Sequence, residues 1–240
     1  AQVSAGLPST LTGNVTIANV AGLSWDASKT INTPGNVTVN SGAKLSFGSP
    51  TVPYSINGTG NFTAKTGSTI VITSSAGIAA SGNNAGSMRL SGTRTFENNV
   101  NYSFSKFDLS TGLLKSYFGS AFGTEITSIN NLTIDNPRGV ADTISGSPSV
   151  TVNGNLNFVS GHLYKKSNKI ILAPGATISG LSNGWIIGST LQKNVANAAS
   201  SVTFEVGSDS LNYTPVTLTL NNVTSSGDLS ASIINAAHPS

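Results

Sequence analysis

The acidic side chains are the first place to look for chemistry in this sequence. Cleavage of a glycosidic bond needs two carboxyl groups that converge on one bond. The closest pair, Glu205 and Asp209, lies in "TFEVGSDSLNY", where strand alternation points Glu205 off one face and leaves Asp209 in the turn that follows. Asp135 and Asp142 flank a turn that contains Arg138, which favours a turn salt bridge. We therefore predict no catalytic carboxylate pair.

Other catalytic and metal-binding patterns are missing from the sequence. The two histidines, His162 and His238, are far apart and do not form a two-histidine metal motif. The absence of Cys excludes disulfides, thiolate metal sites and cysteine nucleophiles. The glycine-rich stretch "SSAGIAASGNNAGS" lacks the lysine of a phosphate-binding loop. We predict no catalytic residue, no metal and no cofactor, and we expect that the chain is not an enzyme.

Exposed aromatic residues remain as candidate ligand contacts, because sugar rings stack on aromatic faces while amides and carboxylates bind their hydroxyl groups. Trp25 beside Asp26, in "GLSWDASKT", is the best exposed candidate for a glycan contact. Tyr54 is another candidate, whereas Tyr117 and Trp185 are more typical of core or cap residues.

The composition bounds the class of protein. Charged residues make up 9% of the chain, far below the usual share in soluble proteins, while hydrophobic residues reach 38%. This balance fits β-structure whose outer faces carry hydroxyl and amide groups. The net charge of +3 reflects few acids, and the basic cluster of Lys165, Lys166 and Lys169 is typical of a solvated hairpin turn. We expect no nucleic-acid partner, and no apolar run approaches the roughly 20 residues of a membrane span.

Three segments repeat one pattern, which indicates the elements that position these side chains. Gly13 opens "GNVTIANV", Gly35 opens "GNVTVNSG" and Gly60 opens "GNFTAKTG", at spacings of 35 − 13 = 22 and 60 − 35 = 25 residues. Periods of this size are typical of a stacked solenoid in which alternate apolar residues share one core. Glycine before each strand permits a corner conformation that a Cβ would hinder.

The residue after each of these glycines is asparagine. Stacked coils would place Asn14, Asn36 and Asn61 above one another, where their side-chain amides can form a ladder along the axis, as in cross-β structure. The sequence therefore predicts an all-β fold, a right-handed parallel β-helix, over the alternative of a sandwich with chance repeats.

The pattern changes along the chain. Residues 125–180 continue the short strands with slightly tighter coils, whereas the strands after Gly184 are longer and lose the coil period. We expect a parallel β-helix over residues 1–184 and an antiparallel β region, a cap or small sandwich, over residues 185–240. The stretch 109–123 contains Gly112 and Gly119, which favours a loop with at most one helical turn.

Four short segments occur in a fixed order along the chain: "NYSF" at 101–104, "INNLTI" at 129–134, "FEVG" at 204–207 and "YTPV" at 213–216. Together they resemble a repeat-rich module of large secreted surface proteins of the Bacteroidetes. That family has an Asn-Tyr-Thr-Phe-like strand, then Val-x-Asn-Leu-Thr-Ile, then Phe-Pro-Val-Gly leading to Tyr-x-Pro-Val. Glu205 stands where the family usually has Pro, and no C-terminal sorting domain is visible.

The resemblance implies an extracellular, adhesin-like β-helix module with no catalytic residues to carry over. It also implies two candidate O-glycosylation sites, Thr143 in "DTI" and Ser210 in "DSL". The first residues, "AQVSAG", fit a mature end left after removal of a signal peptide. We expect a non-catalytic surface module that self-associates as a fibre subunit or contacts other surface proteins. The alternative is a β-helix that binds or cleaves glycans.

Overall fold

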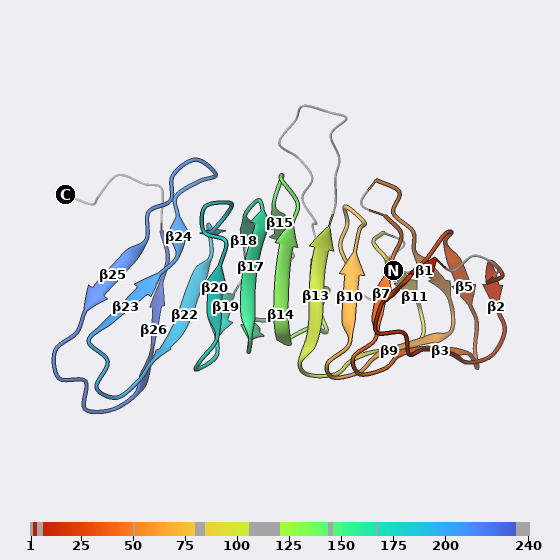
Figure 1. Cartoon of the computed structure of the whole chain (residues 1–240), viewed down its shortest axis with the longest axis horizontal. Coiled ribbons are helices and arrows are strands. Elements are labelled where there is room, and N and C mark those ends of the chain that lie inside the picture. The colour runs from red at the N-terminus through yellow and green to blue at the C-terminus, as the bar shows by residue number, and fades with distance from the viewer. Residues whose placement is uncertain are drawn as a thin grey trace.

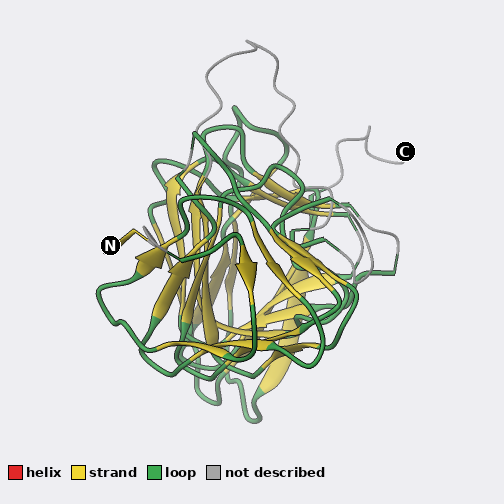
Figure 2. Cartoon of the chain, turned by 90° about the vertical axis from the view of Figure 1, so that its right-hand side faces the viewer, coloured by secondary structure: helices red, strands yellow, loops and turns green. Residues whose placement is uncertain are grey.

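The computed structural model describes residues 2–3, 7–49, 51–79, 85–105, 121–143, 146–166 and 168–233. Within these residues every regular element is a β-strand, and there is no helix. The strands wind into a parallel β-solenoid of about 7 turns, with an antiparallel sheet near the C-terminus. Figure 1 shows the coils side by side along the long axis, and Figure 2 looks along that axis at the strands around the core. The prediction of a parallel β-helix followed by antiparallel β-structure is confirmed.

The first four coils have three faces, and all of their strand pairs are parallel. One face pairs β1 (Gln2–Val3), β4 (Leu23–Ser24), β7 (Lys44–Ser46), β10 (Thr69–Ile72) and β13 (Val100–Ser105). The second face pairs β2 (Thr10–Leu11), β5 (Lys29–Ile31), β8 (Ile56–Gly58) and β11 (Met88–Leu90). The third pairs β3 (Val15–Ile17), β6 (Asn36–Val39), β9 (Asn61–Ala64) and β12 (Arg94–Phe96).

The long strand β14 (Ser128–Asp135) joins these coils to the later ones. Its first residues pair with β16 (Val150–Val152), and its last four pair with β17 (Asn155–Ser160). Behind β16 follow β19 (Lys169–Leu172) and β22 (Thr190–Val195), and behind β17 follows β20 (Thr177–Ser179). A new third face contains β15 (Val140–Asp142), β18 (Leu163–Lys165), β21 (Ile186–Ile187) and β24 (Val206–Gly207).

Antiparallel pairing begins where β26 (Gly227–Ala231) joins the outer edge of β22. A separate hairpin pairs β23 (Ser201–Phe204) with β25 (Val216–Thr219). Parallel pairing also continues through β21, β22 and β24, so both kinds of pairing occur after residue 184. In Figure 1 the two antiparallel pairs lie at the end of the solenoid that carries the C-terminus.

The core follows from strand alternation. In β6, Val37 and Val39 are fully buried while Asn36 and Thr38 lie on the outer face. Parallel register stacks Val37 between Val15 below and Phe62 above, which gives a continuous apolar column. The aromatic rings of Trp25, Phe47 and Phe62 are in successive contact along the core, with centroids 5.1 and 6.5 Å apart. Neighbouring coils thus bury each other's apolar faces, which a single coil could not do alone.

The asparagines of the repeat stack as predicted, but their bonds differ from an amide ladder. Asn36 and Asn61 are in direct register, and the Asn14 Oδ1 accepts the backbone N–H of Asn36 at 3.1 Å. The Asn61 Oδ1 accepts the backbone N–H of Thr93 in the next coil at 2.8 Å. In these two cases the side-chain oxygen binds a backbone N–H of the next coil, which would otherwise lack a partner. The middle level differs, because the Asn61 N–H donates to the Gly35 carbonyl oxygen at 3.0 Å and the Asn36 Oδ1 has no donor among the described residues.

The repeated glycines are required for two different reasons. Gly13 has a φ of 82°, which favours glycine. At Gly35 a Cβ would lie 2.8 Å from the carbonyl oxygen of Gly13, and at Gly60 it would lie 2.8 Å from that of Gly35. The Cβ is thus hindered as predicted, but at Gly35 and Gly60 the obstacle is a carbonyl oxygen of the coil below, together with the Ile31 side chain, and not the local backbone angle.

Candidate functional site

Each of the eight acidic residues in the described ranges makes a local contact of its own. Four form ion pairs: Asp26 with Lys29, Glu125 with Arg94, Asp142 with Lys165 and Glu205 with Lys193. The other four accept hydrogen bonds: Glu97 from Thr66, Asp135 from Ser160, Asp209 from its own turn and Asp228 from Gln192 and Asn194. No group of three or more acidic or histidine side chains that could hold a metal ion occurs in this part of the chain.

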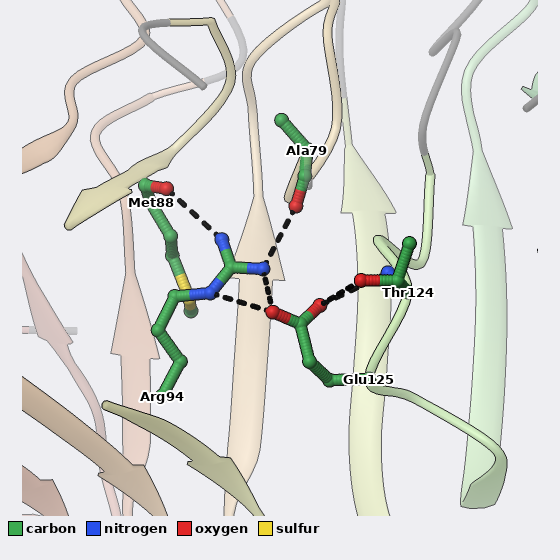
Figure 3. A network of polar contacts seen from close by, with 5 residues as sticks. All are labelled: Ala79, Met88, Arg94, Thr124 and Glu125. Carbon is green, nitrogen blue, oxygen red and sulfur yellow. Dashed lines mark hydrogen bonds and ion pairs between the residues drawn. The ribbon is translucent and has the colours of Figure 1, made fainter. Parts of the chain in front are cut away.

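A buried polar network surrounds Arg94, in the junction between the first four coils and the later ones (Figure 3). Its guanidinium donates to the carbonyl oxygens of Met88 at 3.1 Å and Ala79 at 3.0 Å and forms a two-nitrogen pair with the Glu125 carboxylate. The second carboxylate oxygen of Glu125 accepts the Thr124 backbone N–H at 2.9 Å. The fork of arginine suits this planar pairing.

The Arg94 network replaces apolar packing at one level of the core. Arg94 continues the column of Val15, Val37 and Phe62, and its side chain is fully buried. The guanidinium contacts described above all go to protein atoms, including the Glu125 carboxylate. The positive charge of Arg94 is therefore compensated inside the core. We interpret this network as a structural clamp, since its bonds join Arg94 to Met88, to Ala79 and to Glu125 of the following coil.

A second buried pair joins Asp142 at the end of β15 to Lys165 at the end of β18. The Lys165 Nζ lies 2.7 Å from the Asp142 Oδ2 and 2.8 Å from the Ser147 hydroxyl oxygen. The two side chains are 1% exposed or less, and the Asp142 Oδ1 has no hydrogen-bond donor among the described residues. The interpretation of Lys165 as part of a solvated hairpin turn is therefore wrong, because this lysine pairs in register with the preceding coil.

The predicted glycan contact at Trp25 and Asp26 is not an exposed platform. Trp25 is 2% exposed, and its ring packs edge-on against Phe47 of the next coil. Asp26 binds the buried ammonium of Lys29 at 2.9 Å, and that ammonium also donates to the Leu7 carbonyl oxygen at 3.0 Å. The expectation that Trp25 is exposed is wrong, because the register that pairs Leu23 with Leu45 also places Trp25 beside Phe47.

An aromatic column does lie on the outside of the later coils. The rings of His162, Trp185 and Tyr213 stack in succession, with centroids 4.4 and 5.3 Å apart, and all three are half-buried. The His162 Nδ1 accepts the Trp185 backbone N–H at 3.3 Å. Burial lowers the pKa of His162, against smaller opposing effects of the Ser210 backbone and the Asp209 charge.

Sequence reasoning missed this column as a unit, although a signal was present. His162 and Trp185 are 185 − 162 = 23 residues apart, the same spacing as the register pair Leu163 and Ile186. The Trp185 ring contacts the rings of His162 and Tyr213, and its Nε1 donates to the Asp209 carbonyl oxygen at 2.9 Å. These contacts join the last coils to one another.

The two candidate glycosylation residues are both exposed. Ser210 lies in a turn that the Asp209 carboxylate organises by accepting the backbone N–H groups of Leu211 and Asn212 at 2.7 and 2.9 Å. The hydrogen bonds that the Asp209 carboxylate accepts lower its pKa, and the bond from the Asn212 side chain has the largest effect. Thr143 follows β15 directly. Glu205 instead pairs with Lys193 at 2.6 Å, so the two carboxylates do not form one site.

Tyr54 packs partly buried against the core, while Tyr117, His238 and the whole stretch 106–120 lie outside the described residues. None of the described residues forms a helix long and apolar enough to cross a bilayer. Comparison of the chain with protein-family models, with curated proteins and with solved structures gives no match.

Proposed function

We propose that this chain is a non-catalytic, extracellular module of a cell-surface protein with a structural or adhesive role. The observation that supports the proposal best is the use of the carboxylates. Each described carboxylate holds one coil, turn or strand to its neighbour, and hydrolysis would need two of them free and convergent. A surface rich in hydroxyl and amide groups and poor in charge fits the same role.

We propose further that the module associates with second copies of itself through its antiparallel end. After Val206 no described apolar side chain is fully buried, whereas Leu218 and Leu229 are 39% and 37% exposed. An apolar cavity of about 220 Å³ lies between Val195, Leu220, Val223 and Leu229. The chain carries a net charge of only +3, so identical molecules repel each other weakly. Unpaired strand edges there can extend a sheet into a neighbour.

Sedimentation velocity over a range of concentrations, together with electron microscopy, tests this association. The wild type should form larger species or filaments, and Leu218→Lys with Leu229→Lys should remain monomeric. Val52→Lys is the matched control, because Val52 is 48% exposed on the first coils, and it should associate like the wild type. A wild-type protein that stays monomeric at high concentration would exclude the fibre role.

The glycoprotein proposal concerns Ser210 and Thr143. Ser210 is the better acceptor of the two, because its neighbour Asp209 is half-exposed whereas Asp142, beside Thr143, is buried in its ion pair. The intact mass of the native protein should exceed the 24.3 kDa of the bare chain, and Ser210→Ala should remove most of the excess. A native mass equal to that of the bare chain rejects the modification.

A further inference from the structure

A cavity of about 400 Å³ lies on the outside of the later coils, where β18, β19 and the end of β26 approach one another. The lysine cluster borders it, and hydroxyl groups complete much of its wall: Lys165, Lys166, Lys169, Ser149, Ser189 and Thr190. None of the described residues that line it is acidic. Its volume is in the range of about 300 to 1,000 Å³ that is usual for small-molecule sites, which is far more than a single ion requires.

The charges of the three lysines are balanced to different degrees. Lys165 is neutralised by Asp142 within 2.7 Å. The Lys169 ammonium donates to the Gln192 Oε1, a neutral oxygen, at 2.8 Å. Lys166 is exposed, and no described residue binds its ammonium group. Two positive charges at the cavity thus lack a carboxylate in direct contact.

One acidic residue lies behind the cavity wall. The Asp228 Oδ2 accepts the Gln192 Nε2 at 2.9 Å, so this carboxylate acts on Lys169 through an intervening amide. Asp228 is exposed, and water therefore screens its charge. The amide contact fixes the position of the Lys169 ammonium without neutralising it, and the cavity keeps an excess of positive charge.

The wall of the cavity is held by short bonds between consecutive coils. The Ser189 hydroxyl accepts the Lys165 backbone N–H at 2.5 Å and donates to the Lys165 carbonyl oxygen at 2.9 Å. The Ser149 hydroxyl accepts the Lys169 backbone N–H at 3.3 Å, and Lys169 is in parallel register with Thr190. The buried pair of Lys165 and Asp142 anchors the same coil from inside. A wall fixed in this way loses little freedom when a ligand binds.

We propose that this cavity binds an oxyanion group, a carboxylate or sulfate carried by a sugar unit of an acidic polysaccharide. The ammonium groups of Lys166 and Lys169 supply the charged contacts, and the hydroxyl groups of the wall supply partners for sugar hydroxyls. The proposal goes beyond the structural role, because it needs neither self-association nor glycosylation. It also transfers the glycan-binding alternative from the buried Trp25 to a different face of the molecule.

Isothermal titration with three probes tests the ligand class: a galacturonic acid trimer, the neutral galactose trimer and inorganic phosphate. The acidic trimer should bind, and its affinity should fall at least tenfold between 50 and 300 mM salt or in Lys166→Ala with Lys169→Ala. The neutral trimer should not bind measurably. Lys65→Ala with Lys44→Ala, which removes the same charge from the first coils, is the matched control and should leave the affinity unchanged.

The outcomes separate the sources of the anion. Equal binding of the neutral trimer, or acidic binding that survives in the Lys166 and Lys169 variant, overturns the assignment of the cavity. Binding of phosphate without the acidic trimer reduces the cavity to a free-anion site and rejects the glycan. If none of the three probes binds, the proposed site is rejected. Both substituted ammonium groups are outside the core, so unfolding midpoints should match the wild type and confirm that lost binding is local.

Discussion

The solenoid coils and the antiparallel end use the same kinds of residue to very different effect. In the coils, Val37, Phe62 and Leu132 are fully buried, and the strand that carries each of them is paired on both edges. In the antiparallel end, every residue of β25 and β26 is exposed or half-buried. Strand pairing is therefore present in both regions, whereas β25 and β26 contribute no fully buried side chain. Stability should follow the closed core.

The largest expected difference between the two regions comes from removal of an apolar side chain. Phe62→Ala should cost about 3–5 kcal/mol of unfolding free energy, because it empties a fully buried site between two coils. Leu218→Ala, on the exposed hairpin, should cost less than about 0.5 kcal/mol. Urea unfolding followed by circular dichroism measures both. Equal losses would contradict a division of stability between the coils and the end.

The buried ion pair tests whether the coils tolerate charge only when it is paired. Lys165→Met leaves the Asp142 carboxylate buried without its partner and should destabilise the protein by about 3–5 kcal/mol. Adding Asp142→Leu to that variant should restore most of the loss, because a buried pair can be replaced by apolar groups of similar size. Denaturant midpoints of the two single variants and the double variant give the coupling. A double variant as unstable as Lys165→Met would refute this account.

Glycine substitutions test whether the coils are packed more tightly against one another than the strands of the antiparallel end. A Cβ at Gly60 would lie 2.8 Å from the Gly35 carbonyl oxygen and 2.9 Å from that of Ile31, so Gly60→Ala should cost about 1–3 kcal/mol. At Gly227, in β26, a Cβ would meet nothing within 4 Å, and Gly227→Ala should be neutral or slightly stabilising. Thermal unfolding scans at one protein concentration measure the unfolding midpoints of the two variants and the wild type. A destabilised Gly227→Ala would show that the antiparallel end is packed more tightly than its exposure indicates.

The smallest expected effect is a pH dependence where the two regions meet. The pKa of His162 is lowered in the folded protein, chiefly by burial, so the unfolded chain binds a proton more readily. The neutral ring therefore contributes stability above the unfolded pKa of about 6.5, and this contribution is lost as the pH falls. Relative to His162→Gln, the wild type should lose stability between pH 7 and pH 5. Parallel midpoint curves for the two proteins over this range would reject the assignment.

Local patterns were sufficient to predict the coils. The glycines at 13, 35 and 60, with the alternation of "NVTV", specify coil length and core direction within each repeat. The pairing of β22 was not predictable in the same way, since its sequence fits a parallel neighbour on one edge and an antiparallel neighbour on the other. The choice of partner is a tertiary property that the sequence of the strand itself does not specify.

The side chains that misled the sequence analysis were those whose burial depends on a neighbouring coil. Lys165 looks solvated in "LYKK", but Asp142 lies 165 − 142 = 23 residues earlier and faces it across one coil. Trp25 looks exposed in "SWDAS", but Phe47 covers it from the next coil. In both cases the informative residue lies one period away, so a periodic comparison of the sequence with itself would have found it.

The parallel register has a mechanical consequence. The strands run across the solenoid axis, and the hydrogen bonds between coils run along it. A force along that axis therefore breaks the hydrogen bonds of one coil boundary at a time. Val15 and Val37 are 37 − 15 = 22 residues apart, and Phe62 and Arg94 are 94 − 62 = 32 apart. Each released coil would lengthen the chain by about 70 to 110 Å at full extension. A protein of this design gives way stepwise under load and dissipates work at every step.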